Sequence, residues 1–160
     1  NKVPYSTTNN LNNWYKPNIV FVSKTAVETL GSSWNNITGL LGAITLGSTT
    51  SKVKIEVSVV GHADDDSAIR ILRDGTAIGV GDAAGSRNRV LTANWLNGGA
   101  SQVAAHSAFW VDSPGSTTAS YVIQAFTLSG SFYINRSIQD PDSTGGQRGV
   151  STLLLTELNQ

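Results

Sequence analysis

The stretch that decides the fold is KVKIEVSVV, residues 52–60. Up to residue 59, its apolar residues stand at every second position: Val53, Ile55, Val57 and Val59. Successive side chains of an extended chain point to opposite faces, so these four share one face while lysine, glutamate and serine share the other. This period of two predicts a β-strand with one buried and one solvated face.

The same period recurs along most of the chain. Further strands are predicted over residues 19–23, 42–46, 68–73, 76–80, 90–95, 103–111, 118–126, 131–137 and 150–158. Asp74 and Gly75 separate two of them, and an Asp-Gly pair between strands is typical of a tight hairpin. Residues 24–30 are the one segment whose sequence pattern suggests a short helix. About nine or ten short strands without a long helix predict an all-β fold, an antiparallel sandwich or barrel.

Composition excludes several classes of protein. Eleven basic residues balance eleven acidic ones, so no net field attracts nucleic acid or an anionic membrane. The absence of cysteine excludes disulfides and cysteine-based zinc or iron–sulfur sites. No apolar stretch approaches the 18 residues or so typical of a membrane-spanning helix. We therefore expect neither nucleic acid nor a membrane as a partner.

The N-terminal segment differs in character from the rest. Its first eighteen or so residues are rich in asparagine and threonine and contain Pro4 and Pro17. We expect an extended arm or anchor segment over residues 1–30 and a β-sandwich over residues 31–160. Trp14 and Tyr15 are the candidates for docking the arm on another protein, because aromatic residues are favoured at interfaces.

Two other tryptophans fall in apolar, strand-like runs. Trp34 and Trp110 are therefore predicted to belong to the core of the sandwich.

The segment GHADDDS, residues 61–67, places one of two histidines beside three aspartates. It lies between two predicted strands, so we expect His62, Asp64, Asp65 and Asp66 to form a surface loop available for recognition. Neighbouring side chains of an extended segment diverge, which disfavours a convergent site. Asp64 and Asp66 remain weak candidates for a hard cation such as calcium.

A second acidic segment, DPDSTG at residues 140–145, begins like a calcium-binding loop. An EF-hand requires a bidentate acid at position 12, where Ser151 stands. Asp140 and Asp142 are therefore weak candidates as well, and a polar loop is the alternative. We expect no bound metal and no cofactor.

Catalytic motifs are also incomplete. His106, Asp112 and one of many serines could form a triad, but the chain lacks a G-x-S-x-G elbow. In its predicted strand, His106 falls on the same face as its apolar neighbours, which predicts packing in the core or in a subunit interface. GVGDAA, residues 79–84, matches a dinucleotide-binding pattern but follows a hairpin and precedes no helical period. We therefore expect no enzyme activity.

An ordered set of short segments carries a family resemblance. They are SKVKIEV (51–57), ILRDGTAIGVGD (71–82), RNRV (87–90), DSPG (112–115), YVI (121–123), FYINR (132–136) and GVSTLLLTE (149–157). Together they resemble a domain found in virion proteins of tailed phages, especially marine ones, often at the C-terminal end of tail or head fibres. The resemblance covers roughly residues 34–158.

The resemblance implies a jelly-roll-like β-sandwich that assembles as a homotrimer on the surface of the particle. It also implies binding rather than chemistry, with capsid or tail proteins of the same virion, or a host surface glycan, as partners. Only about thirty residues precede the domain, where a fibre would carry a long shaft. We therefore expect a capsid-decorating, cement or fibre-type protein that stabilises the particle or contacts the host. The alternative is a lectin-like module at the tip of a receptor-binding tail fibre.

Overall fold

The computed structural model describes residues 16–94 and 101–158 of the chain. Within these two ranges it contains eleven strands and no helix, which confirms the all-β class. The strands are β1 (Ile19–Lys24), β2 (Glu28–Gly31), β3 (Asn35–Thr45), β4 (Lys52–Ala63), β5 (Ser67–Arg73), β6 (Thr76–Ile78), β7 (Thr92–Asn94), β8 (Ala104–Asp112), β9 (Thr118–Thr127), β10 (Ser131–Ile134) and β11 (Ser151–Leu158). Trp14 and Tyr15 lie outside the described residues, so arm docking stays a prediction.

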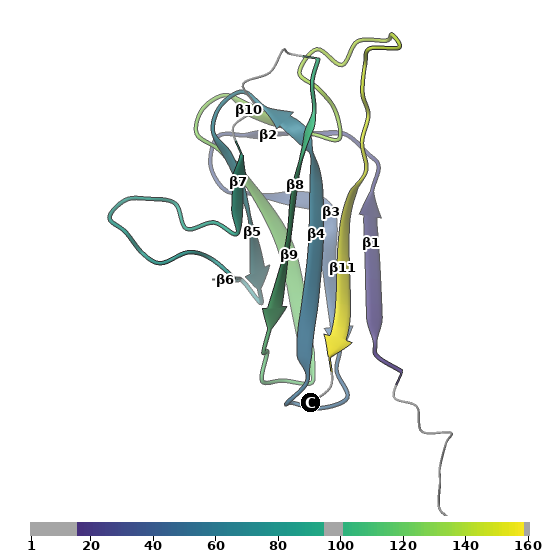
Figure 1. Ribbon diagram of the computed structural model, residues 1–160, viewed down its shortest axis with the longest axis vertical. Helices are drawn as coiled ribbons and strands as arrows, with labels where there is room; N and C mark the ends of the chain where they lie inside the picture. The colour runs from purple at the N-terminus through teal and green to yellow at the C-terminus, as the bar shows by residue number, and fades with distance from the viewer. Residues whose placement is uncertain (1–15, 95–100, 159–160) are drawn as a thin grey trace, which may run out of the picture.

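The strands form two antiparallel sheets packed face to face (Figure 1). In the front sheet β1, β11, β4 and β8 lie side by side, and β10 and β2 continue it beside the end of β4. The back sheet has the order β3-β9-β5-β6, and β7 also pairs with β5. The predicted antiparallel sandwich is confirmed.

Strand β4 is central to the front sheet because it pairs with β11, β10 and β8. Its alternation matches the expectation from sequence, since its four alternating apolar residues are buried: Val53, Ile55, Val57 and Val59. These side chains meet residues of the back sheet such as Tyr121 and Ile123, which are fully buried. Burial of this kind contributes about 1.5–3 kcal/mol for each large apolar side chain.

The turn between β5 and β6 confirms the predicted hairpin. Asp74 and Gly75 both have positive φ, 49° and 86°, as a two-residue turn that matches the twist of its strands requires. The carboxylate of Asp74 also accepts a 3.0 Å hydrogen bond from the backbone N–H of Ser120. The turn is therefore tied to the neighbouring strand β9.

The described part of the predicted arm contains two strands of the sandwich. Strand β1 pairs with β11, and β2 pairs with β10. The segment 24–30, for which a short helix was suggested, is therefore not helical. The sheet thus begins at Ile19, not at residue 31. The strand predicted over residues 19–23 is confirmed as β1. Strand β2 was missed because it is only four residues long.

Candidate functional site

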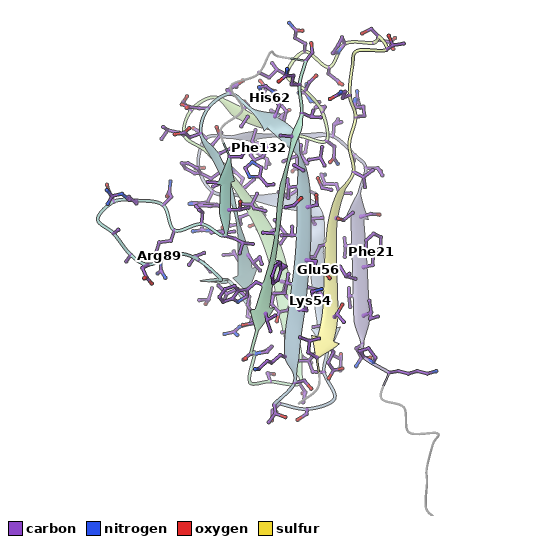
Figure 2. All side chains as sticks on the ribbon, viewed as in Figure 1. Phe21, Lys54, Glu56, His62, Arg89 and Phe132 are labelled. Carbon is purple, nitrogen blue, oxygen red and sulfur yellow. The ribbon has the colours of Figure 1, made fainter. Side chains whose placement is uncertain are left out.

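His62 lies in strand β4, not in a surface loop. The strand continues past Val60 because Gly61 and His62 pair with β10, and His62 is only 3% exposed. Its Nδ1 atom is 2.7 Å from the backbone oxygen of Gln102. Gly61 permits this pairing, since a Cβ atom there would overlap the carbonyl oxygen of Tyr133. The prediction for His62 is therefore wrong. Figure 2 shows His62 and Phe132 near the same end of the sandwich.

The three aspartates that follow do form a connecting segment between β4 and β5, with Asp64 and Asp66 exposed and Asp65 half-buried. A carboxylate oxygen of Asp64 accepts a 2.8 Å hydrogen bond from the backbone N–H of Ser131. Asp65 accepts a 2.6 Å hydrogen bond from the hydroxyl of Ser129. Asp64 and Asp65 thus fix the turn between β9 and β10.

These contacts also set the ionisation of Asp65. The pKa of the Asp65 carboxyl is lowered, mainly by the hydrogen bond from Ser129 and further by the one from the backbone N–H of Asp66. The carboxylate is therefore the favoured form of this side chain. Recognition by this segment stays a prediction.

The two acidic segments do not converge on a metal site. Across residues 16–94 and 101–158, no group of three histidine, aspartate or glutamate side chains is placed to hold a metal ion. Asp140 instead accepts two hydrogen bonds from the guanidinium of Arg148, at 2.6 and 2.5 Å. Asp142 lies on the same loop and is exposed. A guanidinium in this position competes with any cation for the oxygens of Asp140.

His106 is buried between the sheets, as its strand parity predicts, and is 4% exposed. Its ring packs against Phe132 with 5.5 Å between centroids, and its Nε2 atom is 3.1 Å from the hydroxyl of Ser67. That hydroxyl donates its one proton to the backbone oxygen of Asn94. Nε2 must then be the donor to Ser67, so His106 cannot take the proton of that serine.

The other ring nitrogen of His106 has an unusual environment. Nδ1 is buried without a hydrogen-bond partner among the described residues. Desolvation by burial lowers the pKa of His106 to about 4. The imidazole is therefore neutral at physiological pH.

Asp112 does not orient His106. It lies six positions further along β8, about 20 Å away in an extended strand, and is itself buried. Its carboxylate accepts hydrogen bonds from Arg73 at 2.9 and 3.1 Å and from the hydroxyl of Tyr121 at 2.8 Å. Since Arg73 and Tyr121 belong to the back sheet, this cluster joins the two sheets. It is a structural link and not part of a triad.

Neither tryptophan that was predicted for the core lies in it. Trp110 is 41% exposed and its indole lies against Gly79, because β8 is an edge strand that pairs with β4 alone among the described strands. Trp34 is half-buried, 5.3 Å from the ring of Phe126, with the guanidinium of Arg70 4.0 Å from its own ring. An apolar run in the sequence does not reveal which strand is an edge.

A shallow groove lies on the outer side of the back sheet. Its apolar lining includes Ala68, Val90 and Phe126, and Asp66 and Asn88 bring polar groups to it. Sequence reasoning missed this groove because its residues come from separate segments that the fold brings together. On the same side of the sheet, the ring of Trp34 packs at a tilt against Phe126 and lies under the guanidinium of Arg70.

No protein-family model matches the chain, and no curated protein matches it significantly. Among solved structures, the chain is similar to one chain of the structure of infectious bursal disease virus, Gx strain. The two are 15% identical with a TM-score of 0.39, and the match covers 89% of this chain and 38% of the viral one. This chain thus spans well under half of that protein. A likeness at this level carries no conclusion about function.

In residues 16–94 and 101–158 there is no helix of the length and apolarity needed to cross a membrane.

Proposed function

We propose that the chain is a structural protein of a virus particle. It assembles as a homotrimer on the particle surface, as a capsid-decorating, cement or fibre-type protein that stabilises the particle or contacts the host. Capsid or tail proteins of the same virion are its partners, and it catalyses no reaction. The ordered resemblance to surface domains of tailed-phage virions supports the phage assignment.

The observation that carries this proposal is how the chain uses its reactive side chains. Asp112 joins the two sheets, Asp64 and Asp65 hold a turn, and Asp140 pairs with Arg148. His106, buried, cannot deprotonate the serine beside it. Among the described residues, these side chains hold strands and loops in place instead of converging on an open cleft. This suits a durable part of a particle.

Immunogold electron microscopy tests the location. Antibodies raised against the purified chain are applied to intact particles of the phage that encodes it. We expect gold at regular positions on the capsid or the tail. Label confined to the lysate, with none on intact particles, would contradict a virion-surface role.

A second candidate function, glycan binding, is favoured by the groove on the back sheet. A sugar ring can stack on an aromatic face such as Phe126 while hydroxyl groups meet Asp66 and Asn88. Glycan-array binding that is lost in Phe126→Ala and kept in Leu41→Ala would support it. Leu41 is a suitable control because it is 55% exposed and does not line the groove.

A further inference from the structure

One row of side chains crosses the four long strands of the front sheet on its outer side. Phe21 of β1 is paired with Leu154 of β11, Leu154 with Glu56 of β4, and Glu56 with Phe109 of β8. Phe21 and Phe109, at the two ends, are 63% and 68% exposed. Four adjacent strands span about 14 Å, so the two aromatic rings flank one continuous surface.

The next row repeats this arrangement two residues along each strand. Ile19 is paired with Thr156, Thr156 with Lys54, and Lys54 with Val111. Ile19 is 60% exposed and Val111 41%. Both rows therefore have large apolar side chains at their ends. We define the front-face patch by six residues: Ile19, Phe21, Lys54, Glu56, Phe109 and Val111.

An exposed sheet face usually carries polar side chains, because water covers it. Contiguous exposed apolar surface instead marks an interaction site. The patch lies on the sheet that Figure 2 shows face on, where Phe21, Lys54 and Glu56 are labelled. Its apolar ends belong to β1 and β8, each of which pairs with one strand only among the described strands.

The charges at the centre of the patch indicate its partner. The ammonium of Lys54 lies 3.0 Å from a carboxylate oxygen of Glu56, and both side chains are about two-fifths exposed. They are the charged members of the two rows, and they are opposite in sign. A surface with one positive and one negative group in its centre is complementary to a second copy of itself. Around a three-fold axis, Glu56 of each copy can reach Lys54 of the next.

We infer that the front-face patch is a surface through which copies of this chain pack against one another. Apolar side chains at its two ends bury one another's surface, while the central charges set the register of the contact. This inference rests on the self-association in the proposed function and assigns it to particular residues.

The test measures the mass of the full chain by light scattering coupled to size-exclusion chromatography over a range of concentrations. We compare the wild type with Phe21→Ser/Phe109→Ser. The matched control is Leu41→Ser/Leu128→Ser, whose leucines are 55% and 60% exposed and lie outside the patch. Circular dichroism and thermal melting verify that each variant is folded.

We expect an oligomer for the wild type and for the leucine control. The phenylalanine variant should be folded and monomeric, with a dissociation constant raised at least a hundredfold. Equal oligomer stability in the two double variants would overturn the inference.

A charge reversal tests the role of the central pair. Glu56→Lys places two like charges in the patch of each copy, and we expect the dissociation constant to rise at least tenfold. Adding Lys54→Glu restores one charge of each sign, so association should recover. No change in Glu56→Lys, or no recovery in the double variant, would overturn the assigned register.

A unique thiol gives a readout that does not depend on weakening the contact. The chain has no cysteine, so Ser107→Cys beside the patch and Leu41→Cys outside it each introduce one. Maleimide should label position 41 rapidly and position 107 slowly at concentrations where the oligomer forms. Equal labelling rates would overturn the inference.

These outcomes separate the inference from the proposed function. A wild-type monomer at every concentration would overturn both the patch and the homotrimer. A trimer that the phenylalanine substitutions leave intact would overturn the patch alone. Gold labelling of particles depends on neither result.

Discussion

The hydroxyl group of Tyr121 donates a 2.8 Å hydrogen bond to the carboxylate of Asp112, and both side chains are buried. Tyr121 belongs to the back sheet and Asp112 to the front sheet, so the bond crosses the core. Arg73 pairs with the same carboxylate. Burial, followed by the bond to Asp112, raises the pKa of Tyr121, which keeps the phenol a donor. A carboxylate that sequence reasoning placed in a possible triad thus stabilises the sandwich.

Removing one or the other partner of this link should destabilise the protein to different extents. Tyr121→Phe deletes one hydrogen bond and should lower the free energy of unfolding by about 1–2 kcal/mol. Asp112→Ala leaves both Arg73 and the phenol without their partner and should lower it by about 3 kcal/mol or more. Urea denaturation measures both, with Asp142→Ala on an exposed loop as the control. A loss for Asp112→Ala no larger than that for Asp142→Ala would contradict the structural role.

His106 should make the protein sensitive to acid. Its pKa is about 4 in the folded chain, against an ordinary value of 6.5, so the unfolded chain binds the proton more tightly. The stability that the neutral ring contributes is present above pH 6.5 and is lost as pH falls toward 4. Linkage predicts a free energy of unfolding about 2 kcal/mol smaller at pH 5 than at pH 7.

Urea denaturation at the two pH values checks this expectation. In His106→Gln, which cannot be protonated, the difference between pH 7 and pH 5 should shrink by that amount. The same acid sensitivity in the variant and the wild type would assign the effect to other groups.

The acidic segment should tolerate loss of its charges. In Asp64→Asn/Asp65→Asn/Asp66→Asn, each amide oxygen can still accept the hydrogen bonds that the carboxylates accept from Ser131 and Ser129. We expect the variant to fold, with a melting temperature within a few degrees of the wild type. Alanine at the same three positions removes the acceptors and should destabilise the turn by about 1 kcal/mol or more. An unfolded asparagine variant would show that the charges themselves are required.

A pair of glycines isolates the contact with Trp110. Gly79 and Gly85 have nearly equal positive φ, 59° and 60°, but a Cβ atom at Gly79 would lie 2.8 Å from the indole of Trp110, whereas nothing lies within 4 Å at Gly85. Alanine at either position carries about 1–2 kcal/mol of backbone strain. Gly79→Ala should lose more stability than Gly85→Ala and should alter tryptophan fluorescence. Indistinguishable variants would mean that the indole moves aside freely.

The sequence predicted what depends on periodic burial. Strand β4 alternates because one face meets the core, and that signal is local. Asp74 and Gly75 likewise specify their hairpin through backbone conformations that few residues adopt. The burial of His106 followed from its position on the same strand face as its apolar neighbours. Each of these features is determined within a few residues of chain.

Features that depend on distant pairing were missed. His62 is buried because β10 lies beside the end of β4, and Trp110 is exposed because β8 is an edge. Strand β3 runs from Asn35, well before its predicted start, because polar residues with a bulge still pair with β9. The front-face patch is also invisible in the sequence. Ile19 and Phe21 are far from Phe109 and Val111 along the chain, and only the register of four strands unites them.

Quantitative mass spectrometry of gradient-purified particles of the proposed source virus tests the central claim, that this chain is a building part of a virion. Peptides of the chain are counted against those of the major capsid protein. The account predicts a fixed copy number per particle that is a multiple of three and survives repeated purification. Absence of the chain from purified particles, or a trace amount that falls with each purification step, would contradict it.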